Sequence, residues 1–193
     1  MTPQTGTLSR DSVGNPFSDV FIDFMDSQIK TILQYMNLGF DTLPIFGTDD
    51  VRAEAIGYHT AYAVKDEQGK ARLRTFIYTG WLDPALVDPR FADISTIIHE
   101  LAGWTNDPFG NNRAPDWFYP TPTDPSTICS GNPFLEVGDP QVNWPTFTDF
   151  ATFVSRVGGV SYRLQQLVQW QGFADQVPSS AYHVGIRFPS PRR

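Results

Sequence analysis

Hydrophobic residues recur every three or four positions in three segments of the chain, and this spacing predicts helices. The first predicted helix covers residues 17–37, the second residues 94–105 and the third residues 146–157. Their apolar positions are Val20, Phe21, Phe24, Met25, Ile29, Ile32, Leu33 and Met36; Ile94, Ile97, Ile98 and Leu101; and Phe147, Phe150, Val154 and Val157. Ser18 is the predicted N-cap of the first helix, and Gly158-Gly159 predicts the end of the third.

Apolar and polar residues follow a strand-like pattern between the first two predicted helices. Residues 55–64 are rich in apolar side chains. A polar turn follows at residues 65–70, and two kinds of side chain then alternate along residues 72–79. This pattern predicts a β-hairpin. We expect a further strand at residues 182–188 and a flexible leader at residues 1–15, which are polar.

Prolines are concentrated in one long segment. Residues 108–145 contain eight of the 16 prolines, together with several aromatic side chains. Because proline removes a backbone donor and restricts φ, this density predicts a long loop without regular elements, packed by its rings. The expected architecture is a single α+β domain over residues 16–193, with a small mixed or antiparallel sheet.

Composition excludes several classes of protein. The 193 residues include 14 Lys plus Arg and 21 Asp plus Glu, giving a net charge of −7, which argues against nucleic-acid binding. No apolar run is long enough for a membrane span, and the first residues do not resemble a signal peptide. Cys129 is the only cysteine, so an intrachain disulfide is excluded. Only three histidines are available to any site: His59, His99 and His183.

The second predicted helix carries the pair His99-Glu100. At about 100° per residue, both side chains fall outside the apolar stripe, so we expect them to face solvent or a cleft. The pair matches the first half of the zinc-protease motif His-Glu-x-x-His, whose histidines bind zinc and whose glutamate activates a water. Gly103 stands where the second histidine would be, so only half of the motif is present.

Two longer runs carry a resemblance. His-Glu-Leu-Ala-Gly-Trp-Thr-Asn-Asp-Pro-Phe-Gly-Asn-Asn begins at His99, and Leu-Glu-Val-Gly-Asp-Pro follows later. Together they resemble a bacterial family of secreted zincin-like proteins with His-Glu-x-x-Glu, Asp-Pro and Glu-Val-Gly-Asp-Pro motifs, and more distantly exordium-like proteins. The chain departs from that pattern at Gly103, where the family has glutamate.

The resemblance implies a zincin-like fold, a zinc site, and an extracellular or periplasmic location. It implies that His99 is a metal ligand and Glu100 the general base, and that Glu136 and Asp139 supply carboxylate ligands. Asp107 is a further candidate ligand. One imidazole and two carboxylates form a less zinc-selective set, so calcium is an alternative metal. Asp107 and Asp139 each precede proline and also fit the role of turn residues.

The function that these features favour is a zinc-dependent metallohydrolase of the peptidase type, acting on a peptide or protein. The ring-rich loop would bind substrate, and an edge strand of the hairpin could pair with an extended peptide. One alternative is a non-catalytic module on the same scaffold, which the missing side chain at Gly103 favours. Another is a calcium- or glycan-binding module. His59 and His183 are expected to be structural.

Overall fold

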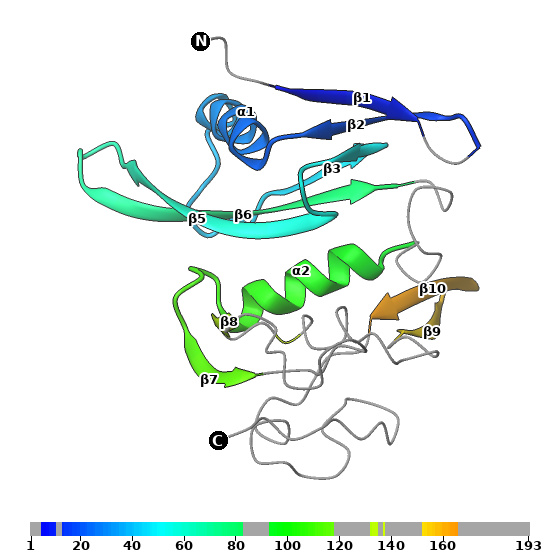
Figure 1. Ribbon diagram of the computed structural model, residues 1–193. Coiled ribbons are helices and arrows are strands. Elements are labelled where there is room, and N and C mark those ends of the chain that lie inside the picture. Colours follow the sequence, from blue (N-terminus) through cyan, green and yellow to red (C-terminus); the bar gives the residue numbers. More distant parts are fainter. Residues whose placement is uncertain are drawn as a thin grey trace. The chain divides into compact units, whose positions relative to one another are not determined.

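Helices and strands both occur along the part of the chain that the structure, a computed structural model, describes: residues 5–10, 13–82, 93–117, 132–134, 137 and 152–165 (Figure 1). The helices are α1 (Ile22–Tyr35) and α2 (Ser95–Asn106). The strands are β1 (Gly6–Arg10), β2 (Pro16–Val20), β3 (Ile45–Asp49), β4 (Val51–Arg52), β5 (Gly57–Lys65), β6 (Ala71–Trp81), β7 (Arg113–Trp117), β8 (Asn132–Phe134), β9 (Thr152–Val157) and β10 (Val160–Gln165). The class is mixed α+β, as expected, and the chain divides into two compact units, Met1–Glu100 and Leu101–Arg193.

A three-stranded sheet in the order β3-β6-β5 forms the centre of the first unit. The predicted hairpin is confirmed, because β5 and β6 pair antiparallel with Tyr58 opposite Tyr78, whereas β3 pairs parallel with β6. Asp66 closes the hairpin turn: its Oδ1 accepts the backbone N–H groups of Gln68 and Lys70 at 3.1 and 2.8 Å. The polar turn and its flanking residues therefore predicted this pairing correctly.

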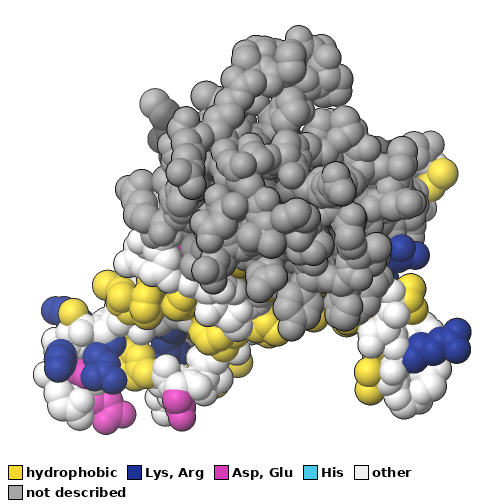
Figure 2. All heavy atoms as spheres, turned by 90° about the horizontal axis from the view of Figure 1, so that it is seen from below, with side chains coloured by type: hydrophobic (Ala, Val, Ile, Leu, Met, Phe, Trp, Pro, Cys, Tyr) yellow, Lys and Arg dark blue, Asp and Glu magenta, His cyan; other side chains and the backbone are white. Residues whose placement is uncertain are grey.

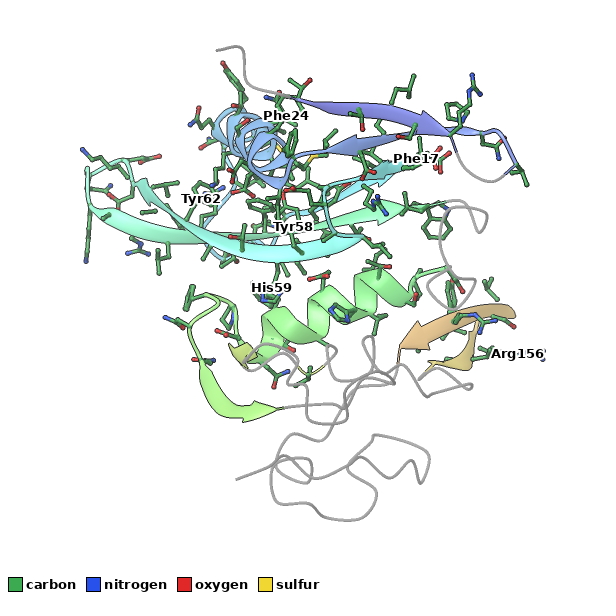
Figure 3. All side chains as sticks on the ribbon, viewed as in Figure 1. Phe17, Phe24, Tyr58, His59, Tyr62 and Arg156 are labelled. Atoms are coloured by element: carbon green, nitrogen blue, oxygen red, sulfur yellow. The ribbon has the colours of Figure 1, made fainter. Side chains whose placement is uncertain are left out.

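Aromatic rings fill the face of this sheet that packs on α1. The buried α1 residues Ile29 and Leu33 belong to one hydrophobic cluster with Phe76 and Tyr78, both of which are fully buried. Edge-on ring contacts extend the cluster, with Phe76 lying 6.0–6.1 Å from three neighbouring rings: Phe46, Tyr58 and Tyr62. Because strand side chains alternate, His59 points to the opposite face from Tyr58 (Figure 3).

The prediction that the first helix begins near Ser18 is wrong, because residues 16–20 form strand β2 instead. This strand pairs with β4, and the Arg52 guanidinium donates hydrogen bonds to both carboxylate oxygens of Asp19 at 2.7 and 2.6 Å. Residues 16–20 are therefore a strand and not part of the helix, because they pair with a strand distant in the sequence. β2 also pairs antiparallel with β1, so Gly6–Arg10 are a strand inside the segment predicted as a leader.

α1 is capped by a distant residue. Its N-cap position, Phe21, provides no side-chain hydrogen bond. Instead, the backbone N–H of Ile22 donates to Glu54 Oε2 at 2.9 Å. A carboxylate at this end also complements the positive pole of the helix dipole. Glu54 therefore caps the N-terminus of α1, the role that the sequence analysis predicted for Ser18.

The third predicted helix is also wrong where the structure describes it. Residues 152–157 form β9, which pairs antiparallel with β10 around Gly158-Gly159. Both glycines have positive φ, 58° and 84°, as a two-residue type I′ hairpin turn requires. The glycine pair thus reverses a strand rather than ending a helix. Residues 146–151 and the strand expected at residues 182–188 lie outside the described residues.

The proline-rich segment contains two short strands, contrary to the prediction of no regular elements. β7 and β8 pair antiparallel, with Arg113 opposite Phe134 and Trp117 opposite Asn132. The register shifts between these two pairs, so the ladder is not continuous. No helix among the described residues is long and apolar enough to cross a membrane.

Charged and hydrophobic side chains lie together around the hairpin turn between β5 and β6. Figure 2 shows Lys, Arg, Asp and Glu side chains among hydrophobic ones on its left side, where Figure 1 places this turn. The surface there is therefore not purely polar.

Candidate functional site

Helix α2 carries the pair His99-Glu100 and begins and ends within one residue of the predicted bounds. The backbone N–H of Ile98 donates to Ile94 O at 3.0 Å, so the helical geometry continues through the residues before the pair. The apolar spacing of Ile94, Ile97 and Ile98 was thus a sufficient signal for this element.

Glu100 does not face solvent, which was one of its two predicted surroundings. Its side chain is only 7% exposed. It packs against β5 at Gly57, where an added Cβ would lie 2.8 Å from Thr96 Cγ2 and 2.9 Å from Glu100 Cγ. The missing side chain at Gly57 is what allows the helix to approach the strand this closely.

Two histidines flank the Glu100 carboxylate. His59 reaches it from β5, with Nδ1 at 3.3 Å from Glu100 Oε2, and His99 Nε2 lies 3.8 Å from Glu100 Oε1. The side chains of His59 and His99 are 6% and 16% exposed. We call His59, Glu100 and His99 the His–Glu–His cluster; His59 points from the sheet toward α2 in Figure 3.

Burial decides how this cluster can behave. A carboxylate taken out of water is stable only when it is hydrogen-bonded or paired with a positive charge. When Glu100 is ionised, His59 Nδ1–H is the donor that meets this need. The arrangement can therefore hold a negative charge, and it can move a proton between a carboxylate and an imidazole.

Asp107 is fully buried and belongs to the second unit. Its Oδ1 accepts the backbone N–H groups of Asn111 and Asn112 at 2.8 and 2.9 Å. The carboxylate thus organises the turn after α2, as the turn interpretation of this Asp-Pro pair proposed.

The remaining predicted ligands, Glu136 and Asp139, lie outside the described residues. Within the described ranges, no group of three or more His, Cys, Asp or Glu residues is arranged to hold a metal ion. The structure thus brings together His99 and Glu100 of the predicted set, and it adds His59.

Sequence reasoning treated His59 as a structural histidine and did not connect it with Glu100. The two residues are 41 positions apart, so no local spacing links them. The one available signal is Gly57, because a glycine inside a strand pattern indicates close approach of another element two residues before His59.

Comparisons with protein-family models, with curated proteins and with solved structures gave no match. Any assignment of function therefore depends on the chemistry of the His–Glu–His cluster and on the sequence motifs around it.

Proposed function

We propose that the chain is a metal-dependent hydrolase of the peptidase type, secreted and zincin-like, with Glu100 as general base. The observation that supports this proposal is the contact of two imidazoles, from separate elements, with one buried carboxylate. A general base must be held within hydrogen-bonding reach of its water and in a defined orientation. His59 provides that orientation by its contact with Glu100 Oε2.

Zinc is the proposed metal because the set includes an imidazole, and calcium is the alternative. Catalytic zinc takes three protein ligands from imidazole nitrogens and carboxylate oxygens, and His99, Glu136 and Asp139 would supply them. When bound, the ion would lower the pKa of a coordinated water. Calcium prefers six to eight oxygen ligands, but Asp107 Oδ1 already accepts two backbone N–H groups.

The chain's own residues would divide the work as follows. Glu100 would take the proton of the attacking water. His59 would hold the Glu100 carboxylate in place from β5. His99 would contribute its imidazole to the metal, in keeping with its position beside Glu100 on α2.

A second candidate, a non-catalytic module on the same scaffold, is favoured by one observation. The contact of Glu100 with both Gly57 and His59 also serves to dock α2 on the sheet. In that case the cluster has a purely structural role, and Gly103 marks the loss of a ligand.

The two candidates differ in what Glu100→Gln does. We expect the full chain, incubated with zinc, to cleave a mixture of quenched fluorescent peptides. Glu100→Gln should lower the cleavage rate by about two to four orders of magnitude, because the amide cannot accept the proton. The matched control is Glu67→Gln at the exposed hairpin turn, which should cleave like the wild type.

Retention of activity in Glu100→Gln contradicts the assignment of Glu100 as the base. Absence of cleavage by the zinc-treated wild type contradicts the peptidase assignment and favours the non-catalytic module. Circular dichroism of each variant verifies that the fold is intact.

A further inference from the structure

A hollow of about 590 Å³ lies between the end of α1 and the β5–β6 hairpin. Residues from both elements line it, among them Leu33, Phe40, Tyr62, Arg72 and Arg74. We call it the Arg72–Arg74 hollow. Its volume falls within the range of about 300–1,000 Å³ that small-molecule sites occupy. All of these residues belong to the first unit, and none of them is a member of the His–Glu–His cluster.

Two guanidinium groups gather around one aromatic ring in this hollow. The Arg72 and Arg74 guanidinium carbons lie 5.3 and 4.9 Å from the centroid of the Phe40 ring. A hydrogen bond of 2.6 Å from Arg74 to the Leu38 carbonyl oxygen fixes the second guanidinium. Both guanidiniums thus lie beside the same ring, and they come from positions two apart on one face of β6.

The charge balance of the lining favours an anion. Among the described residues that line it, Arg72, Arg74 and Lys65 are the cations, and Asp66 and Glu67 are the carboxylates. Asp66 Oδ1 is engaged by the backbone N–H groups of the hairpin turn, which reduces its effect on a ligand. This excess of positive charge occurs in a chain whose net charge is −7.

A hollow at the other end of α1 has the opposite character. Its described lining residues include the carboxylates of Asp23 and Glu54, and there is no lysine or arginine among them. Of the two hollows beside α1, the Arg72–Arg74 hollow is therefore the positively charged one. A position beside α1 does not by itself give a hollow positive charge.

We propose that the Arg72–Arg74 hollow binds a small organic oxyanion, a carboxylate or phosphate ester carrying an apolar ring. Arginine pairs with such oxygens through two parallel N–H donors, and an anion between the two guanidiniums would offset their mutual repulsion. The Phe40 and Tyr62 side chains would contact the apolar part of the ligand, since both line the same hollow.

The test is calorimetric titration of the full chain with phenyl phosphate, benzoate and phenol at roughly physiological salt, where unspecific charge effects are screened. We expect phenyl phosphate or benzoate to bind and phenol not to bind. Arg72→Gln should weaken binding about tenfold, in line with one charge-assisted contact. Arg72 is chosen because it is exposed, whereas Arg74 also donates to the backbone.

Lys70→Gln is the matched control, because Lys70 is an exposed cation of the same hairpin that does not line the hollow. Equal weakening by Arg72→Gln and Lys70→Gln overturns the proposal, as does binding of phenol as tight as that of the anions. Binding of neither anion by the wild type also overturns it. A preference between the two anions identifies carboxylate or phosphate as the natural group.

Discussion

At Gly57, a missing side chain determines how closely a helix approaches a strand. The backbone there does not need positive φ, so the requirement is for space alone. An added Cβ would lie 2.8 Å from Thr96 Cγ2 and 3.0 Å from Glu100 Oε1. These distances are shorter than ordinary van der Waals contact, so the helix or the carboxylate would have to move.

Gly57→Ala is therefore expected to lower the free energy of unfolding by about 1–3 kcal/mol, the usual cost of overpacking. Gly47→Ala is the control, since Gly47 lies in β3 with nothing within 4 Å of its added Cβ. That variant should be neutral or slightly more stable. Urea unfolding monitored by circular dichroism measures both, and equal stability of the two variants would rule out the crowding at Gly57.

Little of the His–Glu–His cluster was predictable at this scale. The helix spacing around His99 and Glu100 placed both residues on α2, and the structure agrees. The same spacing assigned Glu100 to solvent or a cleft, because a helical wheel cannot represent a sheet that contacts the polar side of the helix. His59 entered the cluster through the register of β5, which places it opposite Ile77 and directed away from α1.

The buried phenol of Tyr58 makes the stability of the protein depend on pH. Burial raises the pKa of its phenol above the ordinary value, and the neighbouring Asp26 charge raises it further. The folded state then holds the phenolic proton more tightly than the unfolded state does. This contribution to stability is complete below the unfolded pKa of about 10 and is lost as the pH rises through the folded pKa.

We therefore expect the unfolding free energy to fall between about pH 9 and about pH 11, and to fall less in Tyr58→Phe. Tyr35→Phe is the control, because Tyr35 is 84% exposed. Urea unfolding at the two pH values measures the difference. An identical pH dependence in the wild type and Tyr58→Phe would show that this phenol is not responsible.

Among the elements, α1 depends on a residue far from it in the sequence. Glu54 accepts the N–H of Ile22 from 32 positions away, and it does so with a positive φ of 56°. Local rules pointed to Ser18 because serine is a preferred N-cap, but Ser18 pairs with Val51 in the β2–β4 ladder. The sheet therefore sets where the helix begins.

Removing this cap should be measurable. Glu54→Ala is expected to lower the unfolding free energy by about 1 kcal/mol, the typical cost of losing an N-cap acceptor. Glu54→Gln keeps an oxygen acceptor and should lose less. Glu67→Ala, in the exposed hairpin turn, is a control for loss of a carboxylate. If Glu54→Gln and Glu54→Ala are equally destabilised, the hydrogen bond to Ile22 is not the cause.

Whether each of the other elements was predicted correctly depends on whether its sequence pattern is local and continuous. The β5–β6 hairpin and α2 each have a continuous pattern and a clear boundary, and both were predicted. The segment of residues 152–157 has two apolar positions at helical spacing, Val154 and Val157, but it is also rich in the β-branched and aromatic residues that favour strands. The Gly158-Gly159 pair should have decided between them, since two residues with positive φ favour a tight hairpin turn over a helix end.

In the whole molecule, the candidate active-site helix contains the boundary between the two compact units. Glu100 closes the first unit and Leu101 opens the second, so α2 contributes residues to both. The His–Glu–His cluster lies entirely within the first unit. Glu136 and Asp139, which the sequence predicts as carboxylate ligands, belong to the second unit.

Metal content tests the proposed metal-dependent hydrolase most directly. The purified full chain, incubated with zinc and then desalted, should retain about one zinc ion per chain, as measured by inductively coupled plasma mass spectrometry. His99→Ala should lose it, and Glu100→Gln should keep it, because the proposed base is not a ligand. Zinc content of the wild type no higher than that of His99→Ala would contradict the account and leave the cluster as a structural clamp between α2 and the sheet.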